Sequence, residues 1–517
     1  YNTCMENLAQ KVLQFIVPDS SQWDYWTHTQ NLAPVSQAPC IQSFVNYISS
    51  HKKEKIFVGG DYDCDGILAT TIMVHGLRRL GIEVGYYIPD RIREGYGLHP
   101  ETVQMAHAKG YTTIITVDNG VKAIDALEKA KSYGMTTIVT DHHEIEEEVP
   151  CDILVHPTHM EPIFSTLCGA AVAFECIRAL GVVTTYDLEL AAIASIGDVM
   201  IVKGQTRAII QQGLQLLNAK AEYHISPLAR DRQLNEVNVG FQIVPKLNAV
   251  GRLSNLGNVN TVVRYFLCSD RSQLFSFQQQ INQLNERRKD LSMQMVKHAK
   301  DKCALQEDVL LVSDASYHEG IIGLVAGNLC NAYHKPAIVM TKNQEGYKAS
   351  MRSPEGFNCM TFLKDFPSYS TFGGHAQAAG FSLSPQDYTA FKKYIHDQIQ
   401  TFTWEEPDLE TLVVLPEELT LSAIQSLDQL RPFGPGFRCP SFELIQPTIE
   451  SISPIQNGKH VRYVLINGLE CMNFNQTEEE KQKSVNQIYS FVGQVQINQF
   501  RGKRKPSFII EKINYIG

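Results

Sequence analysis

Hydrophobic and polar positions alternate in a regular order from residue 55 onwards. Short, apolar, β-prone runs are separated by stretches whose apolar residues recur at helical spacing. The expected strands are 55–59, 83–88, 112–117, 136–140 and 152–155, and the expected helices are 66–80, 101–109 and 121–133. Alternation of this kind predicts an α/β domain with a parallel sheet and helices on both faces.

The pattern changes after residue 165. Residues 165–230 are expected to be helical, and apolar positions between Phe277 and Met295 predict one long helix over 270–300. A helix of about 30 residues is about 45 Å long and suits a connector between two lobes. A second, smaller α/β pattern follows, with strands at 309–312 and 337–341 around a helix at 320–330.

The last hundred residues are mostly β-prone and predict a small β-barrel. The expected strands there are 461–466, 488–495 and 508–513, with the basic stretch 501–505 at a hairpin turn between the last two. The acidic stretch Trp404–Asp408 is expected to be a linker. The whole chain is thus expected to divide into five parts: an N-terminal segment (1–50), an α/β domain (51–268), a connecting helix (269–305), a second α/β domain (306–403) and a β-rich domain (404–517).

The composition of the chain restricts its class and location but does not indicate a function. A chain of 517 residues with 44% hydrophobic and 20% charged residues is expected to fold as several domains. No apolar run reaches the roughly 18 residues of a membrane span. Twelve cysteines without a Cys-x-x-Cys pair indicate reduced thiols and a cytoplasmic location. The net charge of −9 does not by itself favour nucleic acid as a partner.

Four short acidic stretches carry the candidate chemistry. They contain Asp61, Asp63 and Asp65; Asp118; Asp141, His142 and His143; and Asp198. The first three stretches follow expected strands, and ligands gather at the carboxyl ends of parallel strands. Carboxylates brought together in a protein interior repel one another unless a cation lies among them. Imidazole mixed with carboxylate favours Mn²⁺ or Fe²⁺ over Ca²⁺.

Each stretch has an alternative interpretation when taken alone. The first could be an acidic turn or a calcium loop, but Ile72 stands where an EF-hand needs its last ligand, Glu. Asp118-Asn119-Gly120 could be a turn, and the two histidines could be an exposed pair. Asp198 interrupts an apolar helical run, where a helix N-cap is the alternative to a cation ligand.

The motifs in this order resemble the DHH phosphoesterase superfamily and, within it, the RecJ family of single-strand-specific 5′→3′ exonucleases. The resemblance covers residues 30–517. Asn119, Met351 and Ala376 depart mildly from the usual family residues, and none of these departures removes a proposed ligand. The matching stretches are 60–66, 88–91, 94–98, 141–143, 245–253, 373–375, 431–436 and 491–510.

The resemblance implies two catalytic lobes joined by the long helix, followed by an OB-fold domain, and it implies site residues in three groups. Two Mn²⁺ or Mg²⁺ ions are expected to bind Asp63, Asp65, Asp118, His142 and Asp198. His143 is expected to stabilise the phosphoryl transition state, with Arg252 contacting phosphate and Asp61 and Asp141 supporting the ligands. The substrate is expected to contact Arg91, Ser350, Arg352, Gly373, Gly374 and His375. A glycine turn with a structural histidine is the alternative for residues 373–375.

The implied function is release of mononucleotides from the 5′ end of single-stranded DNA, in DNA repair and recombination. By the same resemblance, a monomer is expected, with a single-strand-binding protein and a helicase as partners. Two other functions remain open: a phosphodiesterase acting on short oligonucleotides or cyclic dinucleotides, and a catalytically inactive DNA-binding scaffold. The OB-like domain is an argument against the first and the complete ligand set against the second.

Overall fold

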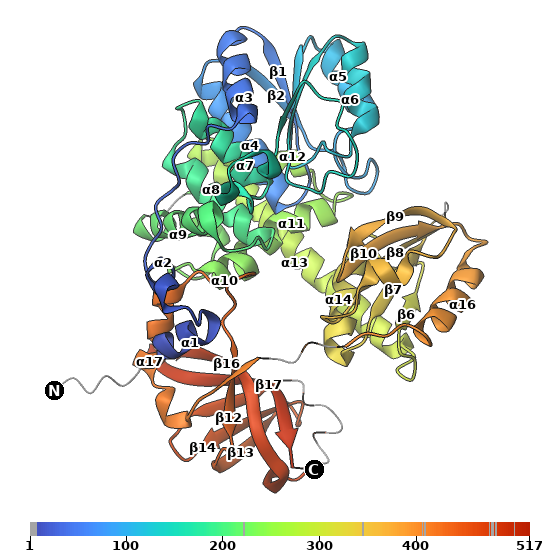
Figure 1. Ribbon diagram of the computed structural model, residues 1–517. Helices are drawn as coiled ribbons and strands as arrows, with labels where there is room; N and C mark the ends of the chain where they lie inside the picture. The colour runs from blue at the N-terminus through green and yellow to red at the C-terminus, as the bar shows by residue number, and fades with distance from the viewer. Residues whose placement is uncertain are drawn as a thin grey trace, which may run out of the picture.

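The computed structural model arranges the chain as three lobes, of which the first and the second are joined by a long helix (Figure 1). It describes residues 8–220, 223–343, 346–405, 407, 410–474, 476, 480, 483–500 and 502–516. None of the helices in these ranges is both long enough and apolar enough to cross a membrane. The eleven cysteines in these ranges are all free thiols.

The first lobe is built on a five-stranded parallel sheet in the order β2-β1-β3-β4-β5. Its strands are β1 (Lys55–Gly59), β2 (Glu83–Tyr87), β3 (Thr113–Val117), β4 (Thr136–Thr140) and β5 (Ile153–Val155). The chain runs from β1 to β2 on one side and then to β3 on the other, so the strand order reverses between β1 and β3. Such a switch point is where open parallel sheets bind ligands. The predicted parallel α/β sheet is confirmed.

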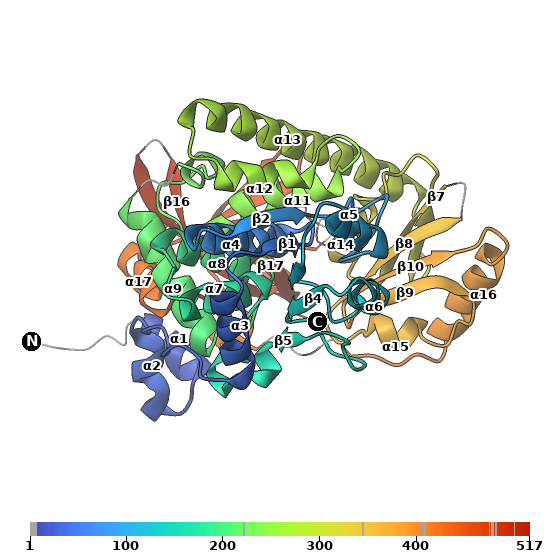
Figure 2. The same ribbon diagram turned by 90° about the horizontal axis from the view of Figure 1, so that it is seen from above.

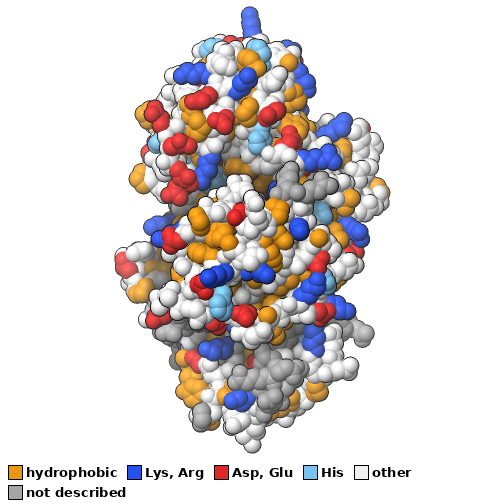
Figure 3. Space-filling model, turned by 90° about the vertical axis from the view of Figure 1, so that its right-hand side faces the viewer, with side chains coloured by type: hydrophobic (Ala, Val, Ile, Leu, Met, Phe, Trp, Pro, Cys, Tyr) orange, Lys and Arg blue, Asp and Glu red, His pale blue; other side chains and the backbone are white. Residues whose placement is uncertain are grey.

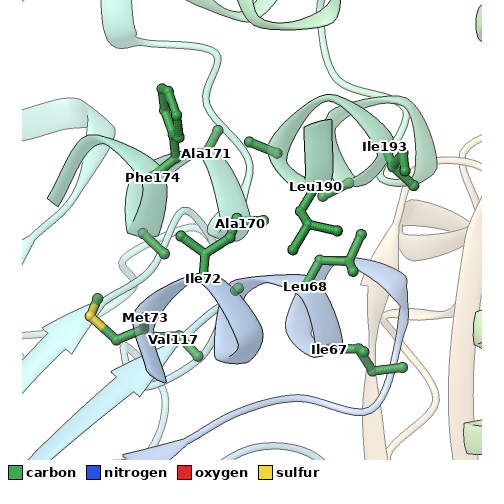
Figure 4. Packing of buried hydrophobic residues seen from close by; sticks show 14 of the residues in the cluster. Ile67, Leu68, Ile72, Met73, Val117, Ala170, Ala171, Phe174, Leu190 and Ile193 are labelled. Atoms are coloured by element: carbon green, nitrogen blue, oxygen red, sulfur yellow. The ribbon is translucent and has the colours of Figure 1, made fainter. Parts of the chain in front are cut away.

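Alternation along each strand sends successive side chains to opposite faces of this sheet. Ile56 and Val58 face one core, which contains α4 and α7, whereas Phe57 faces a smaller core under α5 and α6. Close packing of α4 against α7 and α8 fixes the elements that carry the acidic stretches (Figure 4). The helices of this lobe are α3 (Pro39–Ser50), α4 (Cys64–Arg79), α5 (Pro100–Ala108), α6 (Ile124–Ser132), α7 (Gly169–Ala179), α8 (Thr185–Gly197), α9 (Gly204–Ala219), α10 (Glu236–Asn238), α11 (Val244–Arg252) and α12 (Val259–Leu267).

The predicted long helix is α13 (Arg271–Lys302), with 32 residues. It runs along one side of the molecule, past α12 and α11, towards the second lobe (Figure 2). That lobe is a five-stranded mixed sheet in the order β6-β7-β8-β10-β9. Its elements are β6 (Leu310–Ser313), α14 (Ile322–Tyr333), β7 (Ala337–Lys342), β8 (Tyr347–Arg352), α15 (Cys359–Leu363), β9 (Tyr369–His375), β10 (Ala378–Leu383) and α16 (Tyr388–Ile399).

The C-terminal lobe is a seven-stranded sheet in the order β11-β12-β16-β17-β15-β14-β13. Its core also takes in the first two helices of the chain, whose buried residues include Val12, Leu13 and Trp26. The elements are α1 (Leu8–Ile16), α2 (Trp23–Thr27), β11 (Thr411–Val413), α17 (Leu421–Ser426), β12 (Ser441–Ile445), β13 (Ile449–Ile455), β14 (His460–Leu465), β15 (Glu470–Asn473), β16 (Ile488–Phe500) and β17 (Lys503–Tyr515).

The basic stretch 501–505 differs in part from its prediction. β16 and β17 pair along their length up to Phe500 and Lys503, so Lys503, Arg504 and Lys505 lie within β17 rather than in a turn. Gly502 has the positive φ of a tight turn, 78°. Arg501 lies outside the described residues, as do 406 and 408 of the expected linker.

One buried arginine joins the first lobe to the C-terminal lobe. Arg207 of α9 is fully buried and donates hydrogen bonds to the carbonyls of Trp26, Leu430 and Pro432 at 2.9–3.0 Å. Its guanidinium also lies over the rings of Trp26 and Phe437, which stack on each other at 4.0 Å. Because a buried charge is costly without partners, this joint holds the two lobes in one relative position.

Candidate metal centre and phosphate site

The switch point of the first sheet carries the first acidic stretch. Asp63 caps the N-terminus of α4, where its carboxylate accepts a hydrogen bond from the Gly66 N–H at 3.1 Å. Asp65 accepts hydrogen bonds from the N–H groups of Gly169 and Ala170, at 2.7 and 2.8 Å, at the N-terminus of α7. Helix N-termini attract negative charge, so both carboxylates are fixed by the backbone.

The other acidic stretches converge on one ring nitrogen. Nε2 of His142 lies 3.2 Å from Asp118 Oδ1, 3.5 Å from Asp198 Oδ2 and 3.7 Å from Asp65 Oδ2. Three overlapping triads have ligand atoms within 4.8 Å of one another. They are Asp118–His142–His143, Asp65–His142–Asp198 and Asp61–Asp63–Asp118. The structure thus brings together seven of the eight acidic and imidazole residues in the four stretches, all but Asp141, and shared members link the three triads.

The carboxylates in this cluster lack enough positive partners of their own. Oδ1 of Asp61 and Oδ1 of Asp118 are buried and, within the described part of the chain, accept no hydrogen bond. Burial, and then repulsion by Asp63, holds the pKa of Asp61 well above its usual range. Burial, and then repulsion by Asp65 and Asp63, also raises the pKa of Asp118 well above its usual range. Paired carboxylates with unused oxygens beside imidazole fit Mn²⁺ or Mg²⁺.

Backbone strain marks the same place. Asp118 has a φ of 60°, a left-handed conformation that non-glycine residues seldom adopt. Its carbonyl accepts a hydrogen bond from the Tyr96 hydroxyl at 3.0 Å. A Cβ atom at Gly169 would lie 2.4 Å from the Cβ of Asp118, so only glycine leaves room for this carboxylate. The strain is therefore held by contacts from two other segments, as is common where function demands a fixed geometry.

Asp141 serves His143 rather than the carboxylate cluster. Its Oδ1 accepts from Nδ1 of His143 at 2.8 Å, and its Oδ2 accepts from the Val121 N–H at 3.0 Å. Burial opposes charge on the imidazole, but the hydrogen bond to Asp141 and the charges of Asp141, Asp65 and Asp63 together outweigh it and raise the pKa of His143. The Tyr96 hydroxyl lies 3.2 Å from the same ring. His143 is thereby placed as a cationic donor at the edge of the cluster.

Asp198 differs in position from the prediction. It stands immediately after Gly197, at the C-terminal end of α8, and is neither within the helix nor an N-cap. Its side chain is 29% exposed, so it is not the buried unpaired carboxylate that the apolar run predicted. Burial, with repulsion from Asp65 and Asp63, still raises the pKa of Asp198 to about 9.

The predicted phosphate-contacting arginines come from both lobes. Arg91 follows β2 and lies over the Tyr62 ring at 4.9 Å. Arg252 ends α11, and burial together with the charges of Arg91, Arg352 and Arg288 lowers its pKa to about 9. Four guanidiniums close enough to depress a pKa form a site for a multiply charged anion.

In the second lobe the predicted residues lie in adjacent rows across one sheet. Arg352 and His375 both pair with Ala378, and Ser350 and Gly373 both pair with Gly380. With strands about 4.8 Å apart, the Cα atoms of Arg352 and His375 are about 10 Å apart. Gly373, Gly374 and His375 form the end of strand β9, so the alternative of a glycine turn is wrong. Arg352 donates a hydrogen bond to Ser350 Oγ at 2.9 Å.

Three contributors to the site were missed from the sequence. Asn248 accepts a hydrogen bond from the Cys64 N–H at 2.7 Å and so tethers α11 to the first acidic stretch. A Cβ at Gly323 would lie 3.1 Å from Arg352 Nη2, so this glycine lets the guanidinium lie against α14. Gly169 was the third. Of the three, only Asn248 lies in a stretch that matches the family, 245–253. The role of a helical glycine cannot be predicted from sequence, because it depends on which residues pack against it.

Metal binding is expected to stabilise the protein, and more strongly at high pH. Protons held by carboxyl groups whose pKa is raised must leave before a cation binds, so Mn²⁺ affinity rises with pH towards 9. At a hundred times Kd, a ligand contributes about 2.7 kcal/mol of stability. Thermal unfolding with and without 1 mM MnCl₂ is therefore expected to show an increase in Tm at pH 8.5 and a smaller one at pH 6. A larger increase at pH 6 would contradict the assignment.

Family profiles match three parts of the chain. Residues 55–198 match the DHH family, N-terminal domain; residues 306–401 match the DHHA1 domain; and residues 412–512 match the RecJ OB domain. The three matches follow the order of the three lobes. They account for the parallel-sheet domain, the smaller mixed-sheet domain and the C-terminal sheet.

Curated relatives agree with these matches. The chain is 31% identical over 484 residues to the single-stranded-DNA-specific exonuclease RecJ of Bacillus subtilis, which covers 89% of the chain and 61% of that protein. It is 30% identical to the protein of the same name from Dickeya dadantii, covering 89% of the chain and 87% of the relative. The chain thus spans less than two thirds of the Bacillus relative and most of the Dickeya relative.

Solved structures share the architecture. RecJ from Thermus thermophilus in complex with Mn²⁺ aligns over 99% of the chain and 76% of its own, with a TM-score of 0.83 at 24% identity, which shows the fold alone. An exonuclease RecJ bound to manganese aligns over 72% of the chain and 97% of its own, with a TM-score of 0.63 at 28% identity. Taken together, the domain order, the acidic cluster and the relatives over most of its length show that this chain belongs to the RecJ family of DHH proteins.

Proposed function

We propose that this chain is a metal-dependent exonuclease that removes mononucleotides from the 5′ end of single-stranded DNA. One observation carries the proposal: a carboxylate–imidazole cluster in the first lobe lies beside Arg91, Arg252, Arg288 and Arg352, which come from both lobes and the connecting helix and which, among the described residues, form no ion pair with a carboxylate. The carboxylate–imidazole cluster is suited to hydrolysing a phosphodiester. The guanidinium group is suited to binding a nearby phosphate that carries more negative charge. The space-filling view shows a hollow between the first lobe and the second lobe in front of it (Figure 3).

The proposed reaction cleaves the bond between phosphorus and the 3′-oxygen of the terminal nucleotide. Asp63, Asp65, Asp118, His142 and Asp198 would hold Mn²⁺ or Mg²⁺, which when bound would supply positive charge against the phosphate and lower the pKa of the attacking water. His143, held by Asp141, donates a hydrogen bond to a phosphate oxygen as negative charge develops. Asp61 adds negative charge beside Asp63 and supports the ligand set.

The chemistry explains why a phosphate pocket suits this reaction. Each cleavage releases a nucleoside 5′-monophosphate and leaves a phosphate on the new 5′ end. A pocket formed by Arg91, Ser350 and Arg352 holds that phosphate while Arg252 contacts the phosphate being cleaved. Gly373 and His375 border the pocket, because they lie in the same rows of the sheet as Ser350 and Arg352, and Gly374 lies between them. The end of the strand is thereby recognised by charge.

The C-terminal lobe is the proposed holder of the remaining strand. OB-folds bind single-stranded nucleic acid with a basic surface and stacking aromatic rings. Lys503, Arg504 and Lys505 supply a basic stretch on β17. Because Arg207 fixes this lobe against the first, the strand is directed towards the metal centre. The proposed enzyme is a cytoplasmic monomer that acts in DNA repair and recombination. A helicase and a single-strand-binding protein are its proposed partners and provide the single-stranded DNA.

A phosphodiesterase acting on short oligonucleotides or cyclic dinucleotides is the nearest competing function. Such an enzyme needs the metal cluster and not the third lobe. Hydrolysis of a 5′-phosphorylated single-stranded 30-mer, the same 30-mer in duplex and a dinucleotide separates the two functions. The proposal predicts that the single-stranded 30-mer is degraded at least about tenfold faster than the other two; preference for the dinucleotide would overturn it.

A further inference from the structure

Arg288, in the middle of α13, is the arginine of the four-guanidinium group to which no role has been given. Its neighbours on the helix show where it points. Ile281, seven residues before it, and Asn285, three residues before it, are buried on one face of α13. Met295, seven residues after it, is buried in the core that contains Leu253, the residue after Arg252. Residues three or seven apart share one face of a helix, so Arg288 lies on this buried face, which packs against α11, where Arg252 lies.

The surroundings of Arg288 hold it without neutralising it. Its Nη2 donates a hydrogen bond to the buried side chain of Asn285 at 2.7 Å, which orients the guanidinium. Its Nε is buried and, within the described part of the chain, has no hydrogen-bond partner. Among the described ion pairs, none joins Arg91, Arg252, Arg288 or Arg352 to a carboxylate.

Four positive groups in this setting favour a ligand of high negative charge. A terminal phosphate carries about two negative charges at neutral pH, because its second pKa is about 6, whereas an internal phosphodiester carries one. Asn285 orients the guanidinium of Arg288, and the Nε–H of Arg288 remains free to donate a hydrogen bond to an oxygen of that dianion. A neutral 5′-hydroxyl end offers no charge to Arg288.

We propose that Arg288 is a further substrate-binding residue, which selects a strand carrying a 5′-phosphate monoester over one ending in a hydroxyl. This inference rests on the proposed exonuclease function and deepens it by assigning part of the end specificity to the connecting helix. The neighbouring Arg287 is exposed on another face of α13 and takes no part.

The test compares Arg288→Gln with its matched control Arg287→Gln on one single-stranded 20-mer, prepared with either a 5′-phosphate or a 5′-hydroxyl. Wild type and Arg287→Gln are expected to prefer the phosphorylated strand. For Arg288→Gln the KM of the phosphorylated strand is expected to rise about tenfold, while that of the hydroxyl strand changes less than twofold. Arg288→Lys, which keeps the charge but not the planar fork, is expected to recover part of the preference.

Two outcomes would overturn the inference: an unchanged preference in Arg288→Gln, or an equal loss on both strands, which would indicate a structural role. Thermal unfolding of each variant shows whether the fold is intact. If wild type degraded neither strand, the exonuclease function itself would fail, which is a different result. Preference lost in Arg288→Gln alone supports the assignment.

Discussion

Replacing Asp118 by Asn is expected to lower kcat/KM for single-stranded DNA by at least about a thousandfold in Mn²⁺. Asp118 belongs to two of the three ligand triads, and its buried Oδ1 lies 3.2 Å from Nε2 of His142. Asparagine keeps the volume but removes the charge that offsets a divalent cation. A thousandfold loss corresponds to about 4 kcal/mol of transition-state stabilisation. Initial rates on end-labelled DNA measure it.

The control for this substitution is Asp125→Asn. Asp125 lies exposed on α6, seven residues from Asp118, and is expected to leave kcat/KM within about twofold of wild type. Removing mutual repulsion from a buried cluster also predicts that Asp118→Asn unfolds at a higher temperature than wild type without metal, and gains less from added Mn²⁺. Asp118→Asn protein with wild-type activity would show that the ligand assignment is wrong.

Replacing His143 by Gln is expected to have the second-largest effect, a fall in kcat of about a hundredfold with little change in Mn²⁺ binding. Glutamine can donate a hydrogen bond but carries no positive charge, whereas Asp141 raises the pKa of His143 and favours the imidazolium. The separation of kcat from metal affinity is the informative part. It distinguishes a group that acts on the phosphate from one that only holds the ion.

The pH dependence expected for His143→Gln follows from the raised pKa of His143 in the wild type. A raised pKa keeps His143 protonated to higher pH, so wild-type kcat should decline as pH rises through that pKa. Metal binding changes in the opposite sense, which gives wild type an optimum between the two. His143→Gln is expected to lose the decline on the alkaline side. An unchanged alkaline limb, or a loss of Mn²⁺ affinity as large as the loss of kcat, would contradict the role.

Much of the fold could be predicted because its elements are locally determined. The strands β1, β3 and β4 are short apolar runs, and each is followed directly by an acidic stretch. The topology of parallel sheets then places Asp65, Asp118 and His142 at one edge without further information. The second α/β lobe and a small C-terminal β-barrel were also expected from the residue pattern. The resemblance identified the barrel as an OB-fold domain, and the family matches confirm both domains.

What could not be predicted depends on contacts between distant segments. Residues 8–50 divide between two lobes: Val12 and Trp26 lie in the C-terminal core, whereas Phe44 lies in the first. The sequence of a short amphipathic helix does not show which distant part of the chain packs against its apolar face. Asp198 was expected within a helix because its neighbours are apolar, yet α8 ends at Gly197 so that the carboxylate can reach His142. Arg288 was overlooked because an arginine in a polar helix usually faces solvent.

The most direct measurement follows single-stranded DNA labelled at one end. With Mn²⁺, a strand labelled at its 5′ end should release labelled mononucleotide at the earliest times, whereas a strand labelled at its 3′ end should shorten progressively and keep its label until last. Chelation of the metal should stop both. Early release of the 3′ label, or release that continues in excess chelator, would contradict the account of a metal-dependent 5′→3′ exonuclease.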